Sequence, residues 1–380
     1  MTDHDTLSKK LLKRIAPSQA GFEDLVLVPV FAVIMALILG AVAMLATNIG
    51  FATIGQSYLA LLEGSVGSLN AISETLTAAA PLILAGLGMA LGFRAGMFNI
   101  GAEGQVLIGG MAAVVVGFSF SGLPMVVHLP LALMAGALAG GLYASIAGWL
   151  RAATGAHEVI TTIMLNMIAY RLIDYILRLP VIQRPGRADP ISKSVLDSAE
   201  LPRLLDWIDP NLRVHAGIIL VLAAVFLVHW ILFKSKLGFE FRASGENPEA
   251  ARYAGMRSGL IIVIVMGFAG ALAGLAGANQ VLGVLGRASP GFSAGIGFDA
   301  IAVALLGRSH PVGVLMAGLL FGALEAGGRQ MQVSAGVSID LISIIQALII
   351  VFIAAPLLIR TIFPWGFRKI APTKNSAGKE

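Results

Sequence analysis

The chain has 380 residues, of which 57% are hydrophobic and only 12% are charged. Soluble domains carry about 25% charged residues, so this composition excludes a soluble globular protein and indicates one that crosses a membrane several times. The net charge of +5 lies largely in the two tails and in two loops, so we interpret it as topology information and expect no nucleic-acid partner. The absence of cysteine excludes disulfides, thiolate metal sites and cysteine nucleophiles.

The chain begins with a polar tail, residues 1–24, which contains four basic residues. The first membrane span is predicted over Leu25–Ala46, which carries no charge and is long enough to cross ~30 Å of hydrocarbon. Since basic residues stay on the cytoplasmic side, the tail is predicted to be cytoplasmic. Residues 47–75 contain neither lysine nor arginine, as expected of an external connection.

Further apolar runs predict the remaining spans, at Thr75–Gly92, Gly104–Ser121, His128–Leu150, Glu158–Leu177, Val214–Phe233, Gly259–Gly286, Gly295–Leu306, Val312–Ala326 and Leu341–Ile359. Ten spans return the C-terminal tail, residues 360–380, to the cytoplasm, with loop 178–213 outside and the basic segment 234–257 inside. The short run 295–306 can also be a half-helix, which leaves nine to eleven crossings open.

Glycine pairs four residues apart recur in these spans, at Gly88/Gly92, Gly136/Gly140 and Gly270/Gly274. Small residues at this spacing let two helix backbones approach closely. The pairs therefore predict helix packing and not a functional site.

A polar stretch, Phe93–Gln105, interrupts the apolar pattern between two of the spans. It contains Arg94, Asn99 and Glu103 among glycines that let the backbone bend. In hydrocarbon, an unpaired charge or a broken helix costs several kcal/mol or more. We therefore expect this stretch to face protein or a watery path.

The fifth predicted span is unusually polar. Glu158, Thr162, Asn166 and Tyr170 recur at every fourth residue, which places them on one face of a helix. Such a face points into the bundle or toward a cavity, and the pattern leaves two interpretations open: a hydrogen-bonded seam between helices, or the lining of a transport path. Asp299 poses the same choice in the second half of the chain.

The sequence offers no catalytic pattern. His157 and Glu158 lack the second histidine of the zinc-protease pattern, and neither G-x-S-x-G nor the phosphate loop GxxxxGK[ST] occurs. We expect no enzymatic activity and no cofactor in this chain.

The cytoplasmic segment after the sixth span predicts a short helix. Asn247 is a favourable N-cap and Pro248 suits the first helical position. Glu249 and Arg252 complement the two ends of the helix dipole, and Gly255 can adopt the left-handed conformation that ends a helix. Because a connecting loop needs less structure than this, we expect the helix to dock onto a cytoplasmic partner. The alternative is an interfacial helix that rests on lipid headgroups.

Four motifs in this order resemble signatures of ATP-binding-cassette (ABC) importer permeases: GFRAGMFNIGAEGQ (92–105), HEVITTIMLN (157–166), GENPEAARYAGM (245–256) and GIGFDAIAVALLGRSHPVG (295–313). The branch they resemble is the simple-sugar and nucleoside group, which works with a Bmp-type binding lipoprotein. The resemblance extends from Leu25 to about Ile359. It implies an all-α polytopic membrane protein of about ten transmembrane helices in two repeat-related halves, with residues 25–359 as the permease domain.

The resemblance also assigns roles to individual residues. The segment 245–256 resembles the loop that inserts into a partner ATPase, which makes coupling candidates of Gly245, Glu246, Asn247, Pro248, Glu249, Ala250, Ala251, Arg252 and Gly255. In such permeases the regions 93–105 and 295–307 correspond across the repeat. Together with the polar face of the fifth span, they supply the candidates for the translocation path: Phe98, Asn99, Glu103, Gln105, Glu158, Thr162, Asn166 and Asp299.

The function implied is that of the permease subunit of an ATP-driven importer in the bacterial plasma (inner) membrane, with both termini cytoplasmic and nucleosides or related purine compounds as cargo. The implied partners are a second, homologous permease, an extracytoplasmic substrate-binding lipoprotein, the lipid bilayer and a cytoplasmic ABC ATPase that carries the ATP and Mg²⁺. Permeases for simple sugars or branched-chain amino acids are alternatives. An alternative of another class is a stand-alone secondary transporter or channel, which would need no docking helix.

Overall fold

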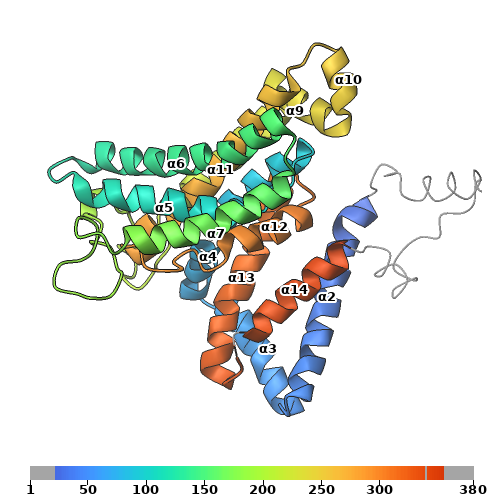
Figure 1. Cartoon of the computed structure of the whole chain (residues 1–380). Helices are drawn as coiled ribbons and strands as arrows, with labels where there is room; N and C mark the ends of the chain where they lie inside the picture. Colours follow the sequence, from blue (N-terminus) through green and yellow to red (C-terminus); the bar gives the residue numbers. More distant parts are fainter. Residues whose placement is uncertain (1–21, 339, 355–380) are drawn as a thin grey trace, which may run out of the picture. The chain divides into compact units, whose positions relative to one another are not determined.

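The computed structural model describes residues 22–338 and 340–354, and in this part of the chain the regular structure is helical throughout (Figure 1). The first half contains α2 (Phe22–Ala46), α3 (Phe51–Val66), α4 (Leu69–Arg94), α5 (Ala102–Ser119), α6 (Met125–Thr154) and α7 (Glu158–Ile176). The second half contains η1 (Asp197–Ala199), α8 (Gly217–Lys234), α9 (Lys236–Glu246), α10 (Pro248–Tyr253), α11 (Ser258–Gln280), the π-helix η2 (Val281–Leu285), α12 (Ile296–Leu306), α13 (Pro311–Ala335) and α14 (Asp340–Ala354).

Residues Gly50–Ile342 form one compact unit, which contains every residue assigned a function from the sequence. A second unit contains α2 and the part of α14 from Ser343 onward, and in it Ala32 and Phe352 are buried in a small apolar cluster. The predicted tails, residues 1–24 and 360–380, lie outside the described residues except for the first three residues of α2.

Seven of the described helices are long and apolar enough to cross a membrane, namely α4, α5, α6, α7, α8, α11 with η2, and α13. Shorter apolar helices at Val30–Ala46, Ile296–Leu306 and Asp340–Phe352 occupy the other three predicted spans. The prediction of an all-helical, multi-pass membrane protein is thus confirmed, whereas the number of crossings stays a prediction. The predicted external connection 47–75 contains a helix of its own, α3, which the search for long apolar runs did not reveal.

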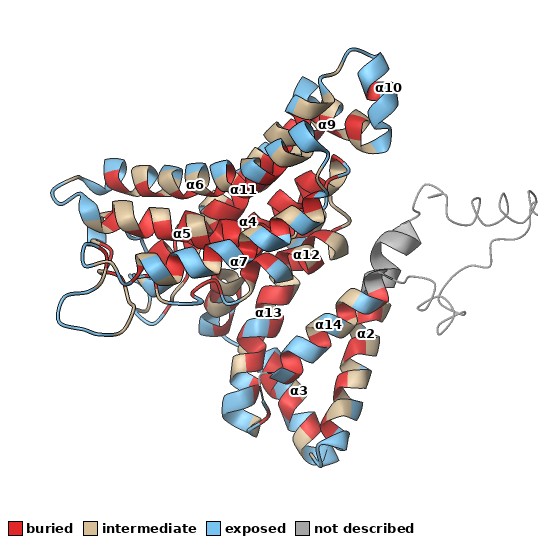
Figure 2. Cartoon of the chain, in the orientation of Figure 1, coloured by how far each residue is buried: buried red, intermediate tan, exposed pale blue. Residues whose placement is uncertain are grey.

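Helix α4 lies in the centre of the larger unit. All residues from Ala79 to Gly92 are buried, and Figure 2 shows α4 enclosed by its neighbours. Its many alanines and glycines let neighbouring helices approach it closely on all sides.

Helix α11 packs against α6 and α5 through the predicted glycines. A Cβ atom at Gly140 in α6 would lie 2.7 Å from the Cα of Gly274, and one at Gly109 in α5 would lie 2.8 Å from the Gly274 carbonyl oxygen. These contacts are backbone against backbone, as small residues allow in membranes. The prediction of helix packing at the pairs Gly136/Gly140 and Gly270/Gly274 is confirmed.

Loop 178–213, which the sequence predicts to lie outside, is folded onto the π-helical end of α11. Leu201 N donates to the Leu282 carbonyl at 3.0 Å, and Val195 N donates to the Gly286 carbonyl at 2.9 Å. The Ala288 amide donates to the hydroxyl of Ser192, also at 2.9 Å. These bonds give the loop a fixed attachment to a membrane helix.

Replacement of Gly274 by alanine should destabilise the protein, because the new methyl group would collide with the Gly136 carbonyl oxygen. Overpacking of this kind costs about 1–3 kcal/mol, since the backbones must separate. The thermal unfolding midpoint of the detergent-purified protein measures the effect. The matched control is Gly55→Ala in α3, where nothing lies within 4 Å of the added atom; equal midpoints for the two variants would contradict the packing described.

Candidate functional site

The polar stretch Phe93–Gln105 forms the connection between α4 and α5. Helix α4 ends at Arg94 and α5 begins at Ala102, so residues 95–101, the α4–α5 connection, are not helical. Arg94 donates from Nε to the Ser309 carbonyl at 3.0 Å, which joins α4 to the connection between α12 and α13. Beside it, burial and then the neighbouring His229 and Arg94 lower the pKa of His310 and favour its neutral form.

Asn99 and Gln105 form a reciprocal amide pair. Asn99 Nδ2 donates to Gln105 Oε1 and Gln105 Nε2 donates to Asn99 Oδ1, each at 3.0 Å. Asn99, only 1% exposed, also accepts from the Gly101 amide at 3.0 Å. The bond from the Gly101 amide thus satisfies a backbone donor that a continuous helix would have paired with its own backbone.

Asn166 reaches the same segment from α7. Its Oδ1 accepts from the Gly104 amide and its Nδ2 donates to the Ile100 carbonyl, both at 2.8 Å. One of the unpaired amides at the start of α5 is satisfied in this way by a side chain of another helix. The structure thus brings together Asn99, Gln105 and Asn166, which the sequence proposed separately.

Glu103 closes the junction of α5 and α12. Its side chain is 0% exposed, and its Oε2 accepts from the Gly297 amide at 2.8 Å. Its Oε1 accepts from the Tyr170 hydroxyl at 2.9 Å and from the hydroxyl of Ser293. Because Glu103 lies in the first turn of α5 and Gly297 in the first turn of α12, the carboxylate stands at the positive ends of two helix dipoles.

The backbones of the two helices also touch at this junction. A Cβ atom at Gly297 would collide with the Glu103 amide nitrogen, so the glycine is needed for the close approach. The regions 93–105 and 295–307, which the resemblance relates by the internal repeat, are therefore in direct contact at the starts of two helices.

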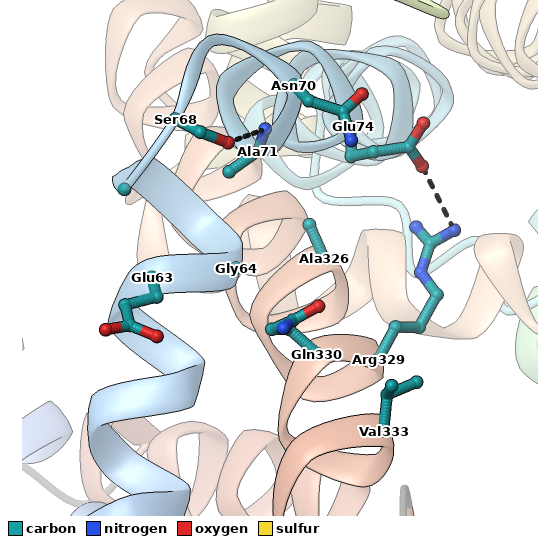
Figure 3. Close-up of a pocket in the computed structure, with 11 residues that line it drawn as sticks. Glu63, Gly64, Ser68, Asn70, Ala71, Glu74, Ala326, Arg329, Gln330 and Val333 are labelled. Atoms are coloured by element: carbon teal, nitrogen blue, oxygen red, sulfur yellow. Dashed lines mark hydrogen bonds and ion pairs between the residues drawn. The ribbon is translucent and has the colours of Figure 1, made fainter. Parts of the chain in front are cut away.

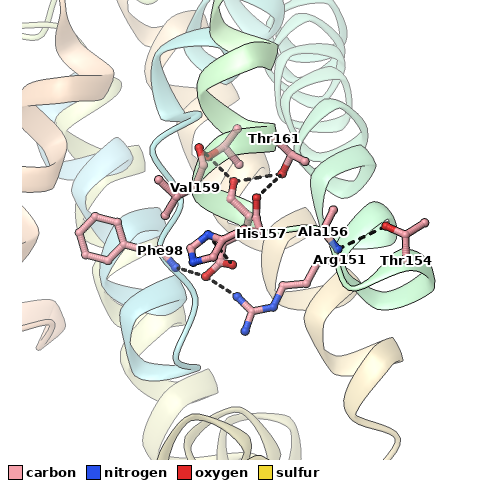
Figure 4. Close-up of polar contacts among 9 residues, drawn as sticks. Phe98, Arg151, Thr154, Ala156, His157, Val159 and Thr161 are labelled. Atoms are coloured by element: carbon pink, nitrogen blue, oxygen red, sulfur yellow. Dashed lines mark hydrogen bonds and ion pairs between the residues drawn. The ribbon is translucent and has the colours of Figure 1, made fainter.

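Glu158 of α7 binds the middle of the α4–α5 connection, at Phe98. Its carboxylate accepts from the Phe98 amide at 3.3 Å and forms an ion pair with Arg151 at the end of α6. Figure 4 shows Arg151, Phe98 and His157 gathered around this carboxylate. The buried hydroxyl of Thr162 donates to the carbonyl of Glu158 at 2.7 Å, within α7 itself. The polar face of α7 points inward, as predicted, and in this conformation it is a hydrogen-bonded seam.

Asp299 and Phe98 differ from the other path candidates. Within the described residues, the Asp299 carboxylate has no hydrogen-bond or ion-pair partner, although it lies in the apolar helix α12. Phe98 is 41% exposed. Phe298, the residue before Asp299, is 46% exposed. An ionisable residue in a membrane bundle is expected to face a partner protein or a watery path.

The coupling segment has the predicted local structure. Asn247 Oδ1 caps α10 by accepting from the Ala250 amide at 3.0 Å, and Gly255 has a φ of +84°. Only Ala251 among the residues of α10 is buried, and Figure 2 shows the helix exposed at the end of the unit. A preceding helix, α9, was not predicted.

Several residues with clear roles were missed by the sequence analysis. Ser293 lies in a glycine-rich loop with no signal that could have distinguished it. Arg151 was missed as a partner of Glu158, although a cation seven residues before a membrane carboxylate was a usable signal. Tyr253, at the end of α10, is 94% exposed, and an aromatic residue in the predicted docking segment was visible in the sequence.

A second polar site lies at the end of α4 opposite the coupling segment. It is a pocket of about 490 Å³ between α3, α4 and α13, lined by Glu63, Asn70, Glu74, Arg329 and Gln330 among others (Figure 3). Glu74 pairs with Arg329 at 3.4 Å and with Arg213, the last residue of loop 178–213, at 3.3 Å. One carboxylate thus links α4, α13 and the loop.

A family model described as the permease component of a branched-chain amino acid transport system matches residues 71–354. The chain belongs to this family. Its relatives include a guanosine ABC transporter permease of Bacillus subtilis, 42% identical over 88% of this chain and 94% of the relative. A glucose ABC transporter permease of Haloferax volcanii is 40% identical over 86% of each chain, and a nucleoside ABC transporter permease of Lactococcus lactis is 35% identical over 89% of this chain and 93% of its own. No solved structure matches significantly.

These matches confirm the resemblance to ABC permeases of the simple-sugar and nucleoside group. They cover the whole junction of α5 and α12 and the coupling segment. The site described above therefore belongs to a transport subunit and not to an enzyme's active centre, because the relatives are permease subunits.

Replacement of Glu103 by alanine should lower the stability of this permease strongly. It leaves the Gly297 amide and the hydroxyls of Tyr170 and Ser293 without their acceptor, at a cost of about 1–3 kcal/mol for each buried group left unpaired. Thermal unfolding of the purified permease measures the loss. Asp299→Asn is the control, since that carboxylate has no partner within the described residues; a Glu103→Ala protein that unfolds at the control's temperature would show that the carboxylate does not hold the junction.

Proposed function

We propose that this permease is the membrane-spanning subunit of an ATP-driven nucleoside importer in the bacterial plasma membrane, with both termini in the cytoplasm. The relatives that transport guanosine and nucleosides support this cargo, because they are 42% and 35% identical over nearly the full length of the chain. The observation that carries the ATP-driven mechanism is α10, a capped and exposed helix on the cytoplasmic segment of a member of this family.

The importer requires partners that this chain cannot replace. A cytoplasmic ABC ATPase supplies ATP and Mg²⁺, a second permease completes the membrane assembly, and an extracytoplasmic lipoprotein delivers the cargo. The family membership supports each of these partners. The outer loop, fixed to the end of α11, is the surface nearest to the delivering protein in the proposed topology.

The exposed face of α10 fits a groove in the ATPase. Glu249 and Arg252 present opposite charges, and Tyr253 adds an aromatic ring that is almost wholly exposed. Exposed aromatic and charged residues of this kind act as anchors at protein interfaces. Movement of α10 with the ATPase would switch the bundle between outward-facing and inward-facing states.

The translocation path, in this proposal, passes the junction of α5 and α12. Phe98 is exposed and Asp299 is partly exposed in the present conformation, and these are the side chains proposed to meet cargo first. The other candidates, namely Asn99, Glu103, Gln105, Glu158, Thr162 and Asn166, are hydrogen-bonded within the chain and would line the path only after the bundle changes state.

Glu249→Arg should uncouple transport. Reversal of the charge at the start of α10 opposes the helix dipole and alters the docking surface, and we expect nucleoside uptake to fall at least about tenfold, within the usual range of coupling between sites. The measurement is ATP-driven uptake of radiolabelled guanosine into proteoliposomes that contain the permeases, the ATPase and the loaded binding protein. Lys236→Glu, an equally exposed charge reversal on α9, is the control, and normal coupling in Glu249→Arg would refute the docking role.

The cargo and the class of transporter can be tested separately. Binding of a panel of nucleosides, simple sugars and branched-chain amino acids to the cognate binding protein distinguishes a nucleoside importer from the sugar alternative, which the Haloferax relative favours. Uptake by this chain alone in liposomes would instead establish a stand-alone transporter.

A further inference from the structure

The predicted coupling segment is in direct contact with the α4–α5 connection, because Gly245 packs against the backbone of residues 94–96. Gly245 lies in the last turn of α9, two residues before the cap of α10. A Cβ atom there would lie 2.9 Å from both the Ala95 carbonyl carbon and the Gly96 nitrogen, and it would collide with the Arg94 carbonyl oxygen. No change of side-chain rotamer can relieve an overlap with backbone atoms.

The contact is equally tight when described from the other side. Gly96 has a φ of +69°, a conformation that side-chain-bearing residues rarely adopt, and its Cβ would lie 3.1 Å from the Cα of Gly245. Two glycines thus meet where the docking helix joins the membrane bundle.

The connection contacted by Gly245 is bonded to several other parts of the bundle. Arg94, before it, donates to the Ser309 carbonyl between α12 and α13. Phe98, within it, donates to Glu158, which pairs with Arg151 of α6. A displacement at Gly96 therefore reaches α6, α7 and α13 through a few hydrogen bonds and reaches Glu103 through seven residues of chain.

Beside this tight contact the packing is loose. A cavity of about 90 Å³ lies between Pro248, at the start of α10, and Ile261 and Val265 of α11. Ser244 and Gly245 line the same cavity. Gly96 borders the cavity as well. The start of α10 is therefore loosely packed against α11, whereas the backbone at Gly245 is in tight contact with the backbone at Gly96.

We propose that the Gly245–Gly96 contact transmits movement of α10 to the membrane helices, and we call this contact the fulcrum. Glycine is required at both positions for this transmission. The proposal rests on the function proposed above, since it assumes an ATPase bound to α10. Force passes from Gly245 to the α4–α5 connection and from there to the junction of α5 and α12. Gly245 and Gly96 are positioning residues and do not contact cargo.

The test uses the complete complex of permeases, ATPase and loaded binding protein in proteoliposomes. We expect Gly245→Ala to retain ATP hydrolysis within about twofold while guanosine uptake falls at least about tenfold, so that the number of ATP molecules spent per transported molecule rises. Gly96→Ala should show the same separation. Gly259→Ala, at the start of α11, is the matched control, because its added atom would lie 3.5 Å from the nearest neighbour, an ordinary contact.

The outcomes separate the two proposals. If the wild-type complex shows no ATP-driven uptake, the proposed function fails. If the wild type transports and Gly245→Ala behaves like Gly259→Ala, the fulcrum is overturned while the function stands.

Hydrogen exchange of the unmutated complex provides a test that does not depend on the folding of a variant. When ATP is added, residues 95–101 should change their amide protection together with residues 245–256. Exchange that changes in 245–256 and stays constant in 95–101 would overturn the fulcrum.

Discussion

The buried carboxylate of Glu103 is the interaction on which the arrangement of the bundle depends. Two helices begin side by side inside the protein, and each leaves unpaired amides and a positive dipole end. One carboxylate satisfies the Gly297 amide and two hydroxyl groups there. Because Tyr170 is one of its donors, the same bond fixes α7 against the junction, and the inward polar face of α7 follows from it.

The sequence predicted those features that depend on neighbouring residues. Spans follow from apolar length, the α10 cap from Asn247 and Pro248, and the close helix packing from glycines four residues apart. The polar face of α7 follows from the helical period. The sequence could not predict which distant groups would meet. Ser293 and Gly297 lie 190 and 194 residues from Glu103, and neither carries a local signal of that contact. Helix α3 was missed because its polar residues interrupt the apolar run.

The coupling segment and the polar stretch were assigned different tasks from the sequence, one docking and the other shaping the path. The structure joins them, since Gly245 lies directly against Gly96. Neither glycine could have been linked to the other by pattern, because 149 positions separate them and glycine is abundant in this chain. The two segments predicted for docking and for the path are therefore in direct contact.

Helix N-termini ordinarily attract anions, and discontinuous membrane helices commonly direct theirs toward a negatively charged cargo. At the junction of α5 and α12 the protein's own carboxylate already occupies that position. A phosphate group that approached would meet a like charge and no free amide from Gly297. If the proposed path passes this junction, an uncharged molecule would meet no electrostatic barrier there, whereas a phosphorylated one would meet the negative charge of Glu103.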